Sequence, residues 1–462
     1  MSVHASLCLM LELVRNREIS PVELVDAHLR QIAARNPALH AFTMIFAEQA
    51  MAEARAAEAA LARGQPAGLL GGIPLTVKDS FDVAGFPTHS GSRLRAGHRA
   101  AEDAAAVARL RAAGAILLGK TNTPELLASY ETDNLLTGRA NNPWDLERTP
   151  GGSSGGEAAA IAAFCSPGGL ATDGGGSIRV PAHFCGIAGL KPTPGCISTR
   201  GHYPTLGYPS GLLGVAGPMA RSAADLRPLF ATLAAYDPED PMSVPVPLLP
   251  YSGRPMRLAV WPQFDGVPVD PEIAAAIDRA ASLAETLGWI VEPFEPQGLD
   301  RAPNLWAQLF LWPSVATRKL IEGREDQCHW TLLESLQAAP PPPTAEQLLT
   351  TLAARDRMRA AFVRQMHPFD AVLMPVSAIP AFRHRERRWP LAGQELGLFQ
   401  AMMPAVVANV LGLPAVTLPI TVSSAGLPLN VQLMGAPFAE KTLLDAAVLL
   451  EEARGPWKGV AV

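Results

Sequence analysis

Two glycine-flanked serines constrain this chain more than any other feature. The first lies in the stretch Gly151-Gly152-Ser153-Ser154-Gly155-Gly156-Glu157, and the second in Asp173-Gly174-Gly175-Gly176-Ser177-Ile178-Arg179. Glycine tolerates positive φ and lets backbone N–H groups approach a ligand closely, which is how an anion-binding loop is built. An Ala-rich segment between the two stretches suits a helix. The pattern predicts a scaffold that presents serine hydroxyls on glycine loops.

Two other interpretations of these loops fit less well. A flexible Gly/Ser linker would not run directly into the apolar segment 158–164. A phosphate loop of the G-x-x-x-x-G-K-[ST] type would need a lysine that is absent in this register. Judged on these residues alone, a nucleophile site and a set of structural turns both remain open.

A lysine upstream favours the nucleophile site. Lys78 ends the short β-prone run Leu75-Thr76-Val77-Lys78. Apolar surroundings favour the neutral amine, because the lysine pKa of ~10.4 can fall by several units on burial. A neutral amine can accept a proton from a serine hydroxyl, so Lys78 is a candidate general base.

Lys78, Ser153 and Ser177, together with Asn142-Pro143-Trp144-Asp145, resemble the amidase signature family, which includes bacterial amidases and enzymes similar to fatty acid amide hydrolase. The resemblance continues through Gly189-Leu190-Lys191-Pro192-Thr193 and returns at Gly412-Leu413-Pro414-Ala415, so it covers nearly the whole chain. It implies an α/β fold, in which residues 1–462 form a single large domain. A mixed, mostly parallel central sheet would be covered by helices on both faces.

The resemblance also implies roles for individual residues. Ser177 would be the nucleophile, Lys78 the general base, and Ser153, preceded by a cis peptide in the family, would pass protons between them. The other implied site residues are Gly174, Gly175 and Gly176 as oxyanion donors, Leu127 and Tyr130 as pocket lining, and Ser154, Thr172, Asp173 and Arg179 as supports of the loops. Core packing is an equal alternative for Leu127. Glu157 stands where many family members carry serine, and a carboxylate in the first turn of a helix suggests a structural role.

Local signals divide the domain into four parts: N-terminal helices (1–65), a catalytic core (66–235), a Pro-rich variable region that shapes the substrate pocket (236–395), and a return to the core sheet (396–462). Ser20 and Glu23 predict a capping box at a helix start, and Asn36-Pro37 predicts its end. Further predicted helices are 48–63, 103–113, 271–287 and 344–366, and predicted strands are 73–78, 115–118, 257–261, 289–294, 369–375 and 415–419.

Three further features have competing interpretations. Lys120 lies in a Gly-Lys-Thr-Asn turn, which favours a solvated or locally bonded side chain. The aromatic stripe of Leu305, Trp306, Leu309, Phe310 and Trp312 suits core packing better than a ligand box. The basic cluster 383–388 suits a solvated loop better than a site for an acidic substrate.

Composition narrows the classes of partner. A net charge of −5 gives no general attraction to nucleic acid or to an anionic membrane. The five cysteines are an odd number without a C-x-x-C pair, and no metal-binding spacing of histidines occurs, so we expect neither a metal nor another cofactor. No leader and no run of ~20 apolar residues is recognisable, which predicts a cytoplasmic protein. The expected partner is a small-molecule amide, with a homodimer as a candidate assembly.

The expected activity is hydrolysis of a carboxamide through an acyl-serine intermediate, with esters as easier acyl donors. The rival is the glutaminase-type A subunit of a tRNA-dependent amidotransferase, which shares the fold and the Lys-Ser-Ser set, and a third class is a non-enzymatic binding protein. In the amidotransferase, the α-amino group of glutamine is held by an aspartate, whose counterpart here is Met402. A thioether cannot neutralise an ammonium group, so the pocket should prefer less polar acyl groups.

Overall fold

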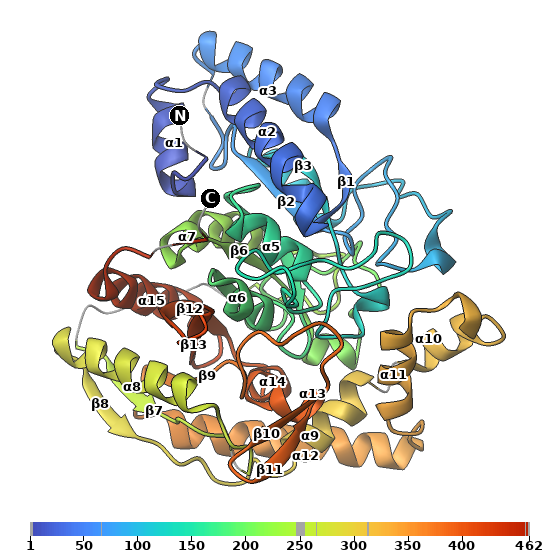
Figure 1. Cartoon of the computed structure of the whole chain (residues 1–462), viewed down its shortest axis with the longest axis vertical. Coiled ribbons are helices and arrows are strands. Elements are labelled where there is room, and N and C mark those ends of the chain that lie inside the picture. The colour runs from blue at the N-terminus through green and yellow to red at the C-terminus, as the bar shows by residue number, and fades with distance from the viewer. Residues whose placement is uncertain are drawn as a thin grey trace.

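The computed structural model describes residues 3–65, 67–245, 255–264, 266–311, 314–457 and 459–460. Trp312 of the aromatic stripe lies outside the described residues, as does the end of the Pro-rich region's first segment. Helices lie on both sides of a long twisted sheet (Figure 1). The prediction of a single α/β domain with a mixed sheet is confirmed.

In the part of the chain that the structure describes, eleven strands form one sheet in the order β1-β3-β2-β4-β6-β5-β12-β13-β9-β7-β8. Their bounds are β1 (Phe42–Ile45), β2 (Pro74–Lys78), β3 (Ile116–Thr121), β4 (Gly168–Asp173), β5 (Ala188–Lys191), β6 (Val215–Ala220), β7 (Arg257–Val260), β8 (Ile290–Pro293), β9 (Ala371–Pro375), β12 (Ala415–Val422) and β13 (Pro428–Met434). A separate hairpin pairs β10 (Arg388–Leu391) with β11 (Gln394–Gly397).

The parallel share of the sheet is smaller than the sequence predicted. Among the described strands, parallel pairs form two blocks, β2 with β3 and β4, and β7 with β8 and β9. The other pairs, including β12 with β13, are antiparallel. Antiparallel neighbours need no crossover helix, and only a short turn separates β12 from β13.

Alternating side chains bury both faces of the sheet. In β9, Ala371 and Leu373 belong to one hydrophobic cluster, whereas Val372 and Met374 belong to another. Successive residues of a strand point to opposite faces, so the two clusters lie on opposite sides. The first includes α1 (Leu7–Arg15), α4 (Ala105–Ala112), α7 (Ala223–Leu233), α8 (Pro271–Thr286) and α15 (Glu440–Arg454). The second includes α6 (Arg179–Cys185), α9 (Ala302–Trp306), α12 (Ala345–Met366), α13 (Leu398–Ala401) and α14 (Met403–Val410).

The remaining helices lie at the edges of these layers. A third cluster joins α2 (Pro21–Leu39), α3 (Ala47–Ala62) and α5 (Gly155–Ala162). In Figure 1, α10 (Ser314–Ile321) and α11 (Trp330–Ala338) extend from one side of the molecule. Leu332 and Leu336 of α11 pack with Leu126 in a small cluster of their own.

The N-terminal helix shows where local signals succeed and fail. The capping box of Ser20 and Glu23 is confirmed, since each side chain bonds to the backbone N–H of the other. The predicted end at Asn36-Pro37 is wrong, because Pro37 lies inside α2 and the helix continues to Leu39. Proline is tolerated here because the Asn36 side chain accepts the next free backbone N–H groups, those of Ala41 and Phe42.

Candidate active site

Lys78 occupies the end of β2, where three hydroxyl groups surround its ammonium nitrogen. Its Nζ lies 2.7 Å from Ser153 Oγ, 2.9 Å from Ser154 Oγ and 2.9 Å from Thr172 Oγ1. The side chain is completely buried, and within the described residues it forms no ion pair. Burial lowers the pKa of Lys78 to about 7, although the charges of Asp173 and Glu157 act in the opposite direction. The environment therefore suits a lysine that exchanges a proton near neutral pH.

The two serine loops meet because β2 and β4 run parallel and end at the same edge of the sheet. The peptide between Gly152 and Ser153 is cis. The backbone N–H of Ser154 donates to the carbonyl oxygen of Ser177 at 3.3 Å, which joins the two loops. Ser177 is half-buried, and among the described residues no hydrogen bond joins its hydroxyl to that of Ser153. The structure thus places Lys78 and Ser153 in contact, and it places Ser177 on the neighbouring loop.

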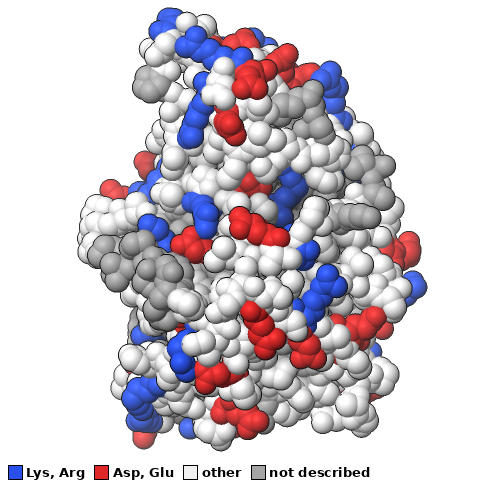
Figure 2. Space-filling model, turned by 90° about the vertical axis from the view of Figure 1, so that its left-hand side faces the viewer, with Lys and Arg blue, Asp and Glu red and all other residues white. Residues whose placement is uncertain are grey.

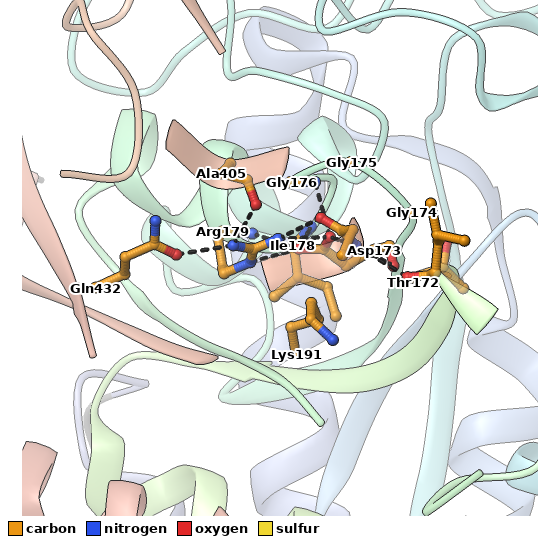
Figure 3. Close-up of polar contacts among 12 residues, drawn as sticks. Thr172, Asp173, Gly174, Gly175, Gly176, Ile178, Arg179, Lys191, Ala405 and Gln432 are labelled. Atoms are coloured by element: carbon orange, nitrogen blue, oxygen red, sulfur yellow. Dashed lines mark hydrogen bonds and ion pairs between the residues drawn. The ribbon is translucent and has the colours of Figure 1, made fainter. Parts of the chain in front are cut away.

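Asp173 and Arg179 support the glycine loop from beneath, as Figure 3 shows. Both are fully buried, and Arg179 donates Nε and Nη2 to the two carboxylate oxygens at 3.0 Å. Arg179 also donates to the side chains of Gln432 and Asn409, each at 2.7 Å. Burial alone would raise the pKa of Asp173, but the charge and hydrogen bonds of Arg179 hold that pKa well below its usual range. This pair is a charged, fully bonded base for the loop.

The same carboxylate occupies part of the predicted oxyanion hole. The backbone N–H of Gly176 donates to Asp173 Oδ1 at 2.7 Å, and that of Ile178 donates to Oδ2 at 3.1 Å. The N–H groups of Gly174, Gly175 and Ser177 have no acceptor among the described residues. Of the three glycines predicted as donors, Gly176 is therefore the one whose N–H is already engaged.

Tyr130 and Leu127 both lie near this loop, in different surroundings. Tyr130 is buried, and its hydroxyl donates to the carbonyl oxygen of Gly175 at 2.7 Å. Leu127, at φ 62°, lines a cavity of about 440 Å³. Other apolar residues of this cavity include Leu126, Tyr203, Leu206, Phe310, Leu332 and Leu336.

The aromatic stripe reaches the glycine loop, a contact that the sequence does not reveal. The indole N–H of Trp306 donates to the carbonyl oxygen of Gly174 at 2.8 Å. Phe310, in the π-helical turn Ala307–Leu311, stacks on Trp306 with ring centroids 5.8 Å apart and also lines the cavity. The core-packing interpretation is thus incomplete, because this part of the core lies against the site. An aromatic pair four residues apart was the only available signal.

Glu157 and Lys120 differ from their sequence interpretations. Glu157 is fully buried and accepts hydroxyl groups from Thr76 at 2.5 Å and Thr121 at 2.6 Å. Burial raises the pKa of Glu157 to about 7, against those two hydrogen bonds. Lys120 is not solvated, because it is buried and its Nζ lies 2.7 Å from Asp79 Oδ1. Hydrophobic surroundings on both sides of the sheet exclude water from both groups.

The basic cluster is not a free solvated loop either. Arg387 pairs with the fully buried Glu131 at 2.8 Å and with Glu334 at 3.1 Å, and His384 lies 3.3 Å from Glu131. Glu131 directly follows Tyr130 in the chain. The cluster therefore fastens the segment that carries Tyr130. Within the described residues, no group of three His, Cys, Asp or Glu side chains converges as a metal site would require.

A family model described as Amidase matches residues 23–444. The chain belongs to the amidase signature family. Members of this family act on carbon–nitrogen amide bonds, and this chain is an enzyme of that type. None of the described helices combines the length and apolar character that a membrane span requires.

Relatives in this family fall into two groups. A glutamyl-tRNA(Gln) amidotransferase protein of Moorella thermoacetica, the A subunit of its enzyme, is 34% identical and covers 97% of this chain and 98% of its own length. Indoleacetamide hydrolase of Bradyrhizobium diazoefficiens is 33% identical and covers 96% of this chain and 85% of its own. A bacterial aryl acylamidase of the amidase signature family has a TM-score of 0.88 at 27% identity, covering 97% of this chain and 96% of its own.

Proposed function

We propose that this chain is an amidase that hydrolyses an apolar or aromatic carboxamide through an acyl-Ser177 intermediate. The observation that carries the proposal is Lys78, which is fully buried and contacts three hydroxyl groups. A lysine in these surroundings can lose its proton near neutral pH and then serve as a base.

The reaction would begin with neutral Lys78. Lys78 takes the Ser153 proton as Ser153 takes the Ser177 proton, and Ser177 Oγ attacks the carbonyl carbon, whose π electrons move onto oxygen. Free N–H groups of the glycine loop stabilise that oxyanion. Collapse breaks the C–N bond while Ser153 returns a proton to the leaving nitrogen, and Lys78 reprotonates Ser153. Water then repeats the attack on the acyl-enzyme and releases the acid.

Two features support an apolar substrate. The cavity beside Leu127 and Phe310 is lined mainly by apolar side chains. Met402 is fully buried at the start of α14, and Ala405 in the first turn of that helix packs against Gly176. A thioether offers no charge to an ammonium group, whereas it packs well on apolar acyl groups.

A second candidate function is the glutaminase-type A subunit of a tRNA-dependent amidotransferase. The names of the curated relatives favour it, since several more at 32–35% identity are amidotransferase proteins of the same kind. Those names weigh against the expectation that nucleic acid plays no part. The face drawn in Figure 2 mixes Lys and Arg with Asp and Glu and offers no continuous basic surface. This side of the molecule therefore gives the second candidate no support of its own.

A substrate panel separates the two candidates. The purified chain alone, without ATP, should hydrolyse 4-nitroacetanilide and indole-3-acetamide and leave free glutamine nearly untouched. Products would be quantified by mass spectrometry, with 4-nitrophenyl acetate as the ester control. Glutaminase activity that appears only with the other components of an amidotransferase would overturn the proposal and establish the second candidate.

The role of Ser177 has its own test. Ser177→Ala should abolish labelling by a fluorophosphonate probe, because it removes the nucleophile and leaves the loop backbone unchanged. Peptide mapping of the labelled wild-type protein should place the adduct on Ser177. An adduct on Ser153, or full labelling of the variant, would exchange the proposed roles.

A further inference from the structure

Two aromatic side chains hold consecutive carbonyl groups of the glycine loop. The indole N–H of Trp306 donates to the oxygen of Gly174, and the hydroxyl of Tyr130 donates to the oxygen of Gly175. Both side chains are about 4% exposed. Tyr130 comes from the catalytic core, whereas Trp306 comes from α9 in the variable region. Hydrogen bonds in such a water-free setting fix the direction of a peptide group firmly.

The two peptide groups differ in what happens to their N–H ends. A trans peptide points its C=O and its N–H in opposite directions. The peptide between Gly175 and Gly176 is held at both ends, by Tyr130 at the oxygen and by Asp173 at the nitrogen. The peptide between Gly174 and Gly175 is held at its oxygen by Trp306, and its N–H has no acceptor among the described residues. That N–H is a donor that is oriented but unused.

We propose that Trp306 is a positioning residue for the oxyanion hole, whose indole N–H aims the backbone N–H of Gly175 at the substrate carbonyl. This inference rests on the proposed acyl-Ser177 chemistry. The oxyanion forms when Ser177 Oγ bonds to the carbonyl carbon and the π electrons move to oxygen, and the Gly175 N–H then donates to that oxygen. Trp306 touches neither the substrate nor the reacting atoms.

Close packing supports this assignment. A Cβ atom at Gly174 would lie 2.0 Å from Phe310 Cζ, and one at Gly175 would lie 2.7 Å from Trp306 Cζ2. The two rings stack at an interplanar angle of 19°. The π-helical turn that carries Phe310 begins directly after Trp306, and such turns are frequent at functional sites. The aromatic pair and the two glycines therefore fit one another as a unit, and a side chain at either glycine would displace it.

The test is Trp306→Phe, which keeps a ring and removes the indole N–H. Loss of a complete oxyanion donor costs about 10²–10³-fold in kcat, so loss of its orientation should cost about 10-fold to 10²-fold. We expect that fall in the rate of fluorophosphonate labelling and in kcat for 4-nitrophenyl acetate, with KM and the pH dependence unchanged. Trp261→Phe is the matched control, because Trp261 lies in the same hydrophobic cluster and packs on Phe264 and Phe362.

Each outcome is decisive. Wild-type protein that is not labelled at Ser177 would refute the proposed function and this inference with it. Wild-type labelling with equal rates for Trp306→Phe and Trp261→Phe would refute the positioning role alone. A higher KM at unchanged kcat would make Trp306 a substrate contact and also overturn the proposal. If Trp306→Phe fails to fold, benzothienylalanine at position 306 keeps the indole shape without its N–H, and the same fall in rate is expected.

Discussion

The ends of β2 and β3 carry two buried lysines that face opposite electrostatic conditions. Val77 pairs with Lys120 and Lys78 pairs with Thr121, so the lysines occupy almost the same level of the sheet. Lys120 lies 2.7 Å from the carboxylate of Asp79 and also donates to the oxygen of Pro87. Lys78 has hydroxyl partners instead. A carboxylate in contact stabilises the ammonium form, whereas hydroxyl groups also accommodate the neutral amine.

This difference explains why only one of the two lysines suits proton transfer. Burial lowers the pKa of both side chains, but the charge of Asp79 opposes the shift at Lys120 directly. In Lys78 the opposing charges belong to Asp173 and Glu157, neither of which forms an ion pair with it. A strand end with a lysine thus becomes a candidate base through what its neighbours lack, and not through burial alone.

The largest expected effect is that of Lys78→Ala. Turnover of 4-nitroacetanilide should fall by at least ~10²-fold, because both the base for Ser153 and the acid for the leaving nitrogen are lost. Turnover of 4-nitrophenyl acetate should fall less, since a phenolate leaves without a proton. In the wild type, activity should rise with pH through about 7 as Lys78 becomes neutral. Equal losses for amide and ester would contradict the role of Lys78 as the acid.

The second effect concerns stability. Lys120→Met keeps most of the aliphatic chain but leaves Asp79 buried without its main partner, since His89 lies 3.7 Å away. The free energy of unfolding in urea should fall by ~3–5 kcal/mol. The double variant Asp79→Asn with Lys120→Met should recover part of that loss. A variant as stable as the wild type that has lost the pH dependence of activity would make Lys120, and not Lys78, the titrating base.

Sequence reasoning found what local signals and short motifs encode. The capping box before α2, the bounds of α3 and α8, and the strand that ends in Lys78 follow from residue order alone. The contact of Lys78 with Ser153 follows from a motif spacing shared across the family. These features depend on a few neighbouring residues, so one sequence is sufficient to predict them.

The partners that tune the site were not predictable, because distant segments supply them. Trp306 meets Gly174 across 132 positions, and Arg387 meets Glu131 across 256. Lys120 precedes an ordinary polar turn, and no local pattern indicates that Asp79 lies opposite. Likewise, the sequence shows three equivalent glycines, whereas loop geometry alone commits the N–H of Gly176 to Asp173. Such contacts arise when the sheet brings strand ends together.

The smallest expected effect belongs to Glu157, and it tests the comparison of the two lysines most closely. The groups that act on Lys78 are Asp173 on β4 and Glu157 on α5, and both favour its charged form. The nearby His202 is neutral at pH 7, because burial lowers its pKa to about 3. Glu157→Gln keeps two polar groups for the hydroxyls of Thr76 and Thr121 and removes one negative charge.

The pKa of Lys78 should then fall, so the rising limb of activity moves to lower pH by on the order of one unit or less. The shift would be measured as the pH dependence of fluorophosphonate labelling between pH 5 and 9. Glu131→Gln is the matched control, because Glu131 is also fully buried and its ion pairs are with Arg387 and His384. We expect that control to keep the wild-type limb. A limb that moves to higher pH in Glu157→Gln would mean that Glu157 accepts the proton itself, and the hydroxyl-bound lysine would then no longer be the base.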